Sequence, residues 1–153
     1  MHILARVYVT GANCAPTDHE LTTLNKWIES EFNSIPCKVK FWTGDITLAE
    51  CKAEFNRTGI LNISTAHNNH PYLSKSMNAK FRAVHDWAHL QMGADDSFAG
   101  EFSTWWANNA PDCIQWILFS EIVLQAAANI TTGEFQPQKL VRALEFAAFV
   151  GAF

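Results

Sequence analysis

The sequence contains few charged residues and no cluster of Lys or Arg side chains. Charged residues make up 17% of the chain and hydrophobic residues 48%, a balance that excludes an intrinsically disordered protein. The formal net charge of -4 gives no long-range attraction to a phosphate backbone, and no basic patch compensates for it. We therefore expect a globular protein without a nucleic-acid partner, whose function depends on a few polar residues.

The sequence also lacks the patterns of a zinc ribbon, a redox motif, a secretory signal and a membrane span. Its four cysteines form no C-x-x-C pair: they are Cys14, Cys37, Cys51 and Cys113. Buried reduced thiols suit a reducing compartment, so we expect a cytoplasmic protein. The N-terminus has no basic region followed by a long apolar one, which predicts no secretory signal. Polar residues interrupt the most apolar stretch, 113–128, which predicts a buried helix and no membrane partner.

The N-terminal region predicts alternating strands and helices. Residues 3–10 are rich in β-branched and aromatic types, which favours a strand, and 37–43 and 60–65 have the same character. Capping-box patterns at Thr17-x-x-Glu20 and Thr47-x-x-Glu50 begin two helices between them. The order β-α-β-α-β predicts a small sheet with helices packed on it.

The C-terminal region predicts helices only. Helical periodicity and breaker residues place them at about 75–92, 98–109, 111–129 and 137–153. We therefore predict an α+β fold, with an N-terminal β-α-β-α-β layer (residues 1–65) followed by a C-terminal helical bundle (residues 66–153), in a single domain that spans 1–153. The apolar tail 146–153 suggests a homo-oligomeric contact, although docking on its own domain explains it equally well.

Two histidines at helical spacing define the candidate site. His85 and His89 lie one turn apart on the same face of the predicted helix. If consecutive helices run antiparallel, Glu101 lies as far after the first turn as His89 lies before it. The same count over the next turn places Glu121 at the level of Glu101. Two imidazoles and one or two carboxylates suit Zn, Fe or Mn, so we predict a divalent metal held by these four residues.

Other residues near this point of the fold have more than one interpretation. Asp86 is either a general base for a metal-bound water or an acceptor that orients a ligand imidazole, and Glu101 is the second candidate base. Asp86 is one methylene shorter than the Glu of zinc peptidases, so no peptidase is predicted. We also predict substrate-binding roles for four residues: His70, Arg82, Gln125 and Trp105. Core packing would explain Trp105 equally well, either histidine could be a buried ring bonded to a carboxylate, and a salt bridge to Arg82 or Arg142 would explain Glu121.

The segment 67–125 resembles a family of proteins from bacteriophages and other mobile elements. The resemblance rests on His70-Pro71, on the run from Phe81 to His89 (F-R-A-V-H-D-x-x-x-H) and on Gly100-Glu101. It implies that the polar set of the family corresponds to His85, Asp86, His89, Glu101, Glu121 and Gln125. The chain departs from the family pattern at Ala88, where the family tends to have Gly, and around Glu121 and Gln125. The family has no firmly assigned activity.

These observations predict a phage-encoded, metal-dependent hydrolase that acts on a nucleotide or another small metabolite in the host cytoplasm. An alternative is a non-enzymatic phage accessory protein that binds a host or virion partner, with the histidines and acids as a structural polar network. A helical di-metal oxidase is a third possibility, but such sites draw on two Glu-x-x-His units, which this sequence does not contain.

Overall fold

The N-terminal segment is a helix, which overturns the predicted strand at 3–10. The computed structural model describes residues 2–149 and 151, and helix α1 spans Ile3–Thr10. Leu4, Ala5 and Tyr8 form its buried face, and α1 packs against the later helix α7 (Gln125–Thr132). Burial of this face outweighs the strand preference of the β-branched residues, because tertiary packing routinely overrides local propensity.

The next elements follow the predicted pattern closely. Helix α2 (Asp18–Asn33) begins at the Thr17 capping box, and helix α3 (Leu48–Thr58) begins at the Thr47 capping box and ends at Gly59. Strands β1 (Lys38–Trp42) and β2 (Ile60–Ser64) flank α3 and form a two-stranded parallel sheet, in which Lys38 pairs with Ile60. A parallel pair needs a crossover connection, which α3 provides. The predicted β-α-β-α-β order is thus reduced to β1-α3-β2.

Helices α4 and α5 carry the candidate site. Helix α4 spans Lys75–Met92, from its Ser74 N-cap to Gly93, as predicted. Helix α5 spans Phe98–Trp106 and ends three residues before the predicted boundary at 109. A five-residue turn joins the two helices, which pack against one another. This hairpin brings side chains from both helices to one level.

The most apolar region of the chain forms one long, buried helical segment. It runs through η1 (Asp112–Ile114), α6 (Gln115–Leu118), η2 (Phe119–Leu124) and α7, and η2 is a π-helix. By length and composition this segment could cross a membrane, but 67% of its most apolar 18-residue stretch is buried inside the protein. Such burial is typical of the core helix of a globular domain and agrees with the predicted buried helix.

The predicted helix from Pro137 to the C-terminus is wrong over its first half. Residues 134–143 are irregular, and α8 spans only Leu144–Phe149. This irregular segment bonds to the N-terminal segment: Tyr8 Oη donates to the Pro137 carbonyl at 3.0 Å, and Lys139 Nζ to the Gly11 carbonyl at 2.8 Å. Within the apolar tail 146–153, for which a contact is predicted, residues 150, 152 and 153 lie outside the described residues.

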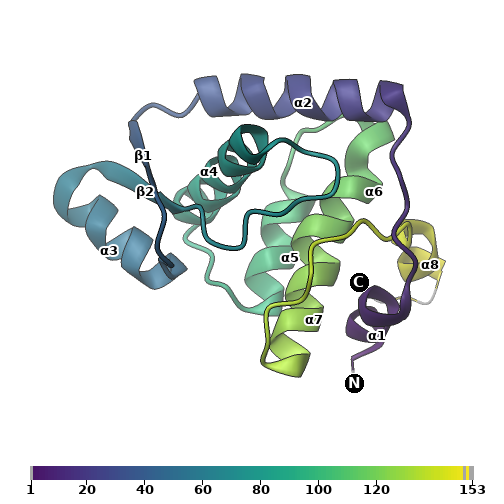
Figure 1. Cartoon of the computed structure of the whole chain (residues 1–153). Coiled ribbons are helices and arrows are strands. Elements are labelled where there is room, and N and C mark those ends of the chain that lie inside the picture. Colours follow the sequence, from purple (N-terminus) through teal and green to yellow (C-terminus); the bar gives the residue numbers. More distant parts are fainter. Residues whose placement is uncertain (1, 150, 152–153) are drawn as a thin grey trace.

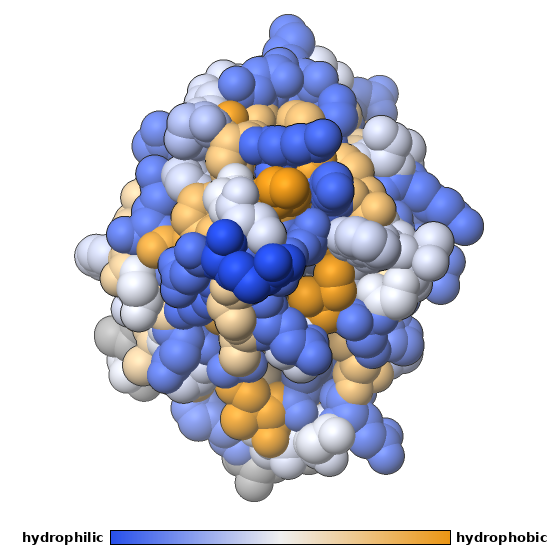
Figure 2. Space-filling view, turned by 90° about the vertical axis from the view of Figure 1, so that its left-hand side faces the viewer, coloured by the Kyte–Doolittle hydropathy of each residue, from blue (hydrophilic) through white to orange (hydrophobic). Residues whose placement is uncertain are grey.

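Two hydrophobic cores meet at α4. The larger core contains α1, the helical segment 112–132 and residues of α2, α5 and α8, while the smaller one lies between α3, β2 and α4. In Figure 1, α2 crosses one side of the molecule, α3 and the sheet lie at one end, and α1 and α8 lie at the other. Figure 2 shows the end with α3 and the sheet, where hydrophilic side chains cover most of the face. The α+β class is confirmed, but α1 packs on α7, so the N-terminal region is no separate layer.

The cysteines are free, but the predicted burial of the four thiols is wrong for three of them. Only Cys51 is fully buried, in the smaller core, and Cys113 is exposed. Burial raises the pKa of the Cys51 thiol to about 11, so it stays protonated and is a poor nucleophile at neutral pH.

Candidate metal site

A polar stripe on α4 forms one wall of the site. Asn78, Arg82, His85 and His89 are spaced at i, i+4, i+7 and i+11, which places them on one face of the helix. Asn78 and His89 are buried, and the other two are partly buried. A helix that buries so many polar groups on one face must provide them with partners from neighbouring elements.

The turn after α4 brings Glu101 to the two histidines. Gly93 ends α4 with a positive φ of 64°, and Ser97 caps α5, so Glu101 falls in the first turn of α5. Gly100, just before it, lies so close to Asp95 that a Cβ atom would collide with the Asp95 carbonyl. The Gly-Glu pair in the sequence therefore has a steric reason: only glycine lets α5 approach the turn closely enough.

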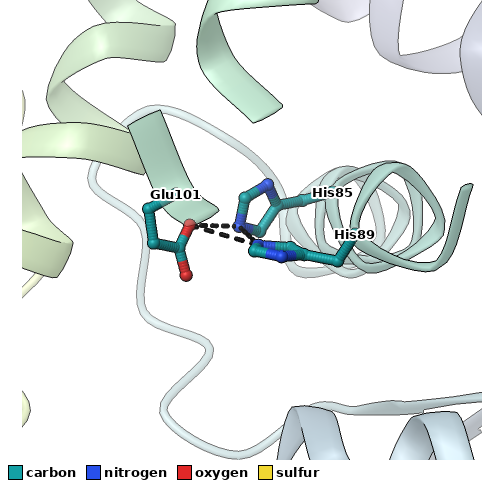
Figure 3. Close-up of side chains that lie close together, drawn as sticks. All are labelled: His85, His89 and Glu101. Atoms are coloured by element: carbon teal, nitrogen blue, oxygen red, sulfur yellow. Dashed lines mark hydrogen bonds and ion pairs between the residues drawn. The ribbon is translucent and has the colours of Figure 1, made fainter. Parts of the chain in front are cut away.

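Three ligand-type atoms converge between α4 and α5 (Figure 3). Glu101 Oε2 lies 2.8 Å from His85 Nε2 and 3.3 Å from His89 Nε2, and the two Nε2 atoms are 3.1 Å apart. A tetrahedral zinc ion with bonds of about 2.0–2.1 Å holds its ligand atoms about 3.3 Å from one another. The three distances are close to that value, so these residues can hold a metal ion and leave a fourth position open.

The hydrogen bonding of the same atoms also fits a metal. Glu101 Oε2 is buried and has no partner with hydrogen-bond geometry among the described residues. His89 Nδ1 lies 3.4 Å from the Ala94 carbonyl, a contact that requires a proton on Nδ1 and leaves Nε2 with a lone pair. A backbone carbonyl that sets the tautomer in this way is common for metal-binding histidines.

Without a metal, His85 and Glu101 form an ion pair. Burial acts to lower the pKa of His85, but the Glu101 carboxylate outweighs it and raises that pKa above 6.5. Burial acts to raise the pKa of Glu101, but the charge on His85 outweighs it and lowers that pKa from 4.5 to about 2. Because the pKa of His85 is raised, a cation that enters the site competes with a proton for this ring.

Asp86 lies beside this group without belonging to it. Burial raises the pKa of the Asp86 carboxyl above 3.8, and the attraction of His85 and His89 opposes that change. Its carboxylate makes no hydrogen bond to the residues that the structure describes, and it lines a pocket next to His85. Asp86 is therefore available to a ligand in that pocket.

The structure places Glu121 outside the metal group. Glu121 lies in the π-helix η2, and its Oε1 is 3.0 Å from His70 Nε2, with both side chains buried. His70 Nδ1 accepts the backbone N–H groups of Tyr72 and Leu73, at 3.0 and 2.9 Å. The proton of a neutral His70 is therefore on Nε2 and is donated to Glu121. Counting residues along antiparallel helices predicted that Glu121 lies at the level of the metal group. Glu121 is close enough to His85 to interact with it electrostatically, but its carboxylate bonds to His70.

The remaining predicted substrate-binding residues have different surroundings. The Arg82 guanidinium donates to the backbone carbonyls of Ser64, Ala66 and His67, which ties the loop after β2 to α4. Gln125 Nε2 donates to the Gln136 carbonyl at 3.3 Å. Both side chains line the pocket beside His85, together with Glu121. Trp105 instead packs in the larger core, 4.9 Å from the Phe119 ring between centroids, as the core-packing alternative implies.

The pocket beside His85 contains residues that the sequence-based prediction missed. Asn78 and Gln138 line it, as do His67 and Phe135 at its exposed rim. For Asn78 a sequence signal existed, because it precedes His85 by seven residues and so falls on the same helix face. Gln138 and Phe135 carried no such signal, since the irregular segment 134–143 reaches the pocket only through the tertiary fold. A second pocket, lined by Trp27 and Ile122 among others, reaches His85 from the side of α2.

Comparison of the chain with models of protein families, with curated proteins and with solved structures finds no match.

Proposed function

We propose that this protein is a metal-dependent hydrolase with a mononuclear centre made of His85, His89 and Glu101. The observation that carries the proposal is the triangle of two Nε2 atoms and one Oε2 atom with edges of 2.8 to 3.3 Å. Two histidines, one carboxylate and an open position are the ligand set of many catalytic zinc sites. Zn is the first choice of metal, and Fe or Mn would suit the same nitrogen and oxygen ligands.

The chemistry follows from the open position. A metal held by His85, His89 and Glu101 would supply a water of lowered pKa, and Asp86, which lines the pocket next to His85, would accept the proton of that water. In such a hydrolysis the water oxygen would form a bond to the electrophilic atom of the substrate, the bond to the leaving group would break, and Asp86 would return the proton to that group. Because Glu101 is a ligand in this arrangement, Asp86 is the stronger candidate for the base.

The biological setting of the proposal comes from the resemblance of segment 67–125 to the phage family. It supports a phage-encoded protein that acts on a nucleotide or another small metabolite in the cytoplasm of the host. A di-metal oxidase is disfavoured, because the group that can hold a metal among the described residues contains a single carboxylate.

One observation favours the non-enzymatic alternative. The ion pair between His85 and Glu101, at 2.8 Å, satisfies both charges without a metal, as in a structural polar network. A phage accessory protein that binds a host or virion partner would need nothing more from these residues.

Metal analysis of the purified protein separates the two functions. We expect one divalent ion per chain, and a thermal midpoint that rises by about 5–10 °C when the metal is present at about 100 times its dissociation constant. His85→Ala and His89→Ala should abolish both effects, while His19→Ala, at an exposed position on α2, should leave them intact. A protein without bound metal and without a metal-dependent midpoint would contradict the hydrolase and favour the accessory role.

A further inference from the structure

The pocket beside His85 has the size and position of a substrate site. Its volume is about 320 Å³, and His85 and Asp86 are among the residues that line it. Small-molecule pockets begin at about 300 Å³, so this one suits a ligand no larger than a nucleoside. Whatever binds here lies directly against the proposed metal centre.

The amide of Asn78 is fixed with an unpaired acceptor. Asn78 is fully buried, and its Nδ2 donates to Asn68 Oδ1 at 2.7 Å and to Gln138 Oε1 at 3.4 Å. Asn68 uses its own Nδ2 to donate to the Lys75 carbonyl at 2.9 Å, so its oxygen must face Asn78. Turning the Asn78 amide over would place oxygen against oxygen. Its Oδ1 therefore remains an acceptor, and no residue in the described ranges donates to it.

Several other polar groups of the pocket can accept hydrogen bonds from a ligand. Asp86 and Glu121 contribute carboxylates to the lining. The Arg82 guanidinium donates to three backbone carbonyls, and Gln125 Nε2 donates to the Gln136 carbonyl. A ligand that donates hydrogen bonds would therefore give Asn78 Oδ1 the partner it lacks and could also reach the carboxylates of Asp86 and Glu121.

Flat aromatic surfaces border the same pocket. The rings of His67 and Phe135 are stacked at its rim, with centroids 4.9 Å apart and planes 22° apart. His67 has a positive φ of 52°, a conformation that few non-glycine residues adopt, and Arg82 holds its carbonyl in place. Phe81 lies further inside. Such surfaces favour a planar ring, since ring faces stack on one another.

We propose that this pocket binds an amino-substituted nucleobase, as the base or the nucleoside, whose exocyclic amino group donates to Asn78 Oδ1 and the carboxylates. The unpaired Asn78 Oδ1 and the two carboxylates favour an amino group over a carbonyl oxygen, and the aromatic rim favours a planar ring. This inference rests on the proposed function only for the hydrolysis of the bound base or nucleoside. Binding itself needs no metal.

Matched nucleoside pairs test the proposal by isothermal titration calorimetry. Cytidine and uridine differ by an amino group in place of a carbonyl oxygen, as do adenosine and inosine. We expect at least one amino nucleoside to bind at least tenfold more tightly than its carbonyl counterpart, because the carbonyl would face unpaired acceptors. If neither pair shows a preference, or no nucleoside binds, the proposal is wrong.

A rim variant localises the binding without endangering the fold. Phe135 is 49% exposed, and Phe135→Ala should weaken binding of the preferred nucleoside at least fivefold. Phe41→Ala is the matched control, since Phe41 is 45% exposed and lies on β1 outside this pocket. Equal binding by both variants and the wild type would place the nucleoside elsewhere and overturn the proposal.

Titrations with chelator and with zinc distinguish this proposal from the proposed function. Nucleoside preference in a protein that binds no metal would support the pocket and contradict the hydrolase. Bound metal without nucleoside preference would support the metal centre and contradict the base-binding pocket.

Discussion

The substitution Glu101→Gln keeps the shape of the side chain and removes its negative charge. In the metal-free protein the pKa of Glu101 is lowered from 4.5 to about 2, which corresponds to about 3 kcal/mol of stability at a pH where the pair with His85 is charged. Glutamine resembles the neutral acid, so the variant should lose about this free energy of unfolding. For a chain of this length the thermal midpoint should fall by about 6–12 °C.

The loss should depend on pH in a defined way. The folded pKa of Glu101 lies below its unfolded value, so its stabilisation is complete above about pH 4.5 and is lost as the pH falls toward 2. The pKa of His85 is raised, so its contribution is complete below pH 6.5 and is lost as the pH rises through the folded value. The wild type should therefore exceed the variant most near pH 5–6.5, and by less at pH 3 and at pH 9.

Urea denaturation in the presence of a chelator measures this difference at each pH. Glu134→Gln is the control, because Glu134 is exposed and its carboxylate forms no ion pair within residues 2–149. It should match the wild type throughout. The reasoning is refuted if Glu101→Gln is as stable as the wild type at pH 6, or if the difference is the same at pH 3, 6 and 9.

Two further substitutions test the surroundings of the site. Gly100→Ala should destabilise the protein by about 1–3 kcal/mol and weaken metal binding, because the new methyl group collides with the Asp95 carbonyl. Thermal melting and metal titration measure the two effects. Gly44→Ala is the control and should change neither quantity, because Gly44 has open space around it. His70→Phe should cost about 3 kcal/mol or more in urea denaturation, because it leaves the buried Glu121 carboxylate without its partner; a cost below about 1 kcal/mol would show that the pair is not structural.

The sequence by itself determined the elements whose boundaries depend on local contacts. A capping box bonds a side chain to a backbone group three residues away, so Thr17 and Thr47 mark the starts of α2 and α3 whatever the rest of the chain does. Ser74 and Gly93 bound α4 for the same reason. The spacing of His85 and His89 needed only the helix, and the short turn to α5 brought Glu101 to the same level.

Tertiary structure decided what depends on partners distant in the sequence. Residues 3–10 became a helix because α7 offers a surface that buries Leu4 and Tyr8, and no local pattern encodes that surface. The segment after Pro137 stays irregular because its backbone groups bond to the N-terminal segment. Glu121 contacts His70 and not the group of His85, His89 and Glu101. The tertiary fold places His70 Nε2 3.0 Å from its carboxylate, and a buried carboxylate needs such a donor.

The candidate site shows the same division between local and distant contacts. Helical spacing alone could predict the two histidines, and a count along two helices could predict Glu101. The pocket beside them is closed by α4, by η2 and by the irregular segment that carries Phe135 and Gln138. The orientation of the Asn78 amide depends on Asn68 and Gln138, ten and sixty residues away in the chain. Local spacing and one short turn thus predicted the grouping of His85, His89 and Glu101 but misplaced Glu121, and the shape and polarity of the pocket came only from the folded chain.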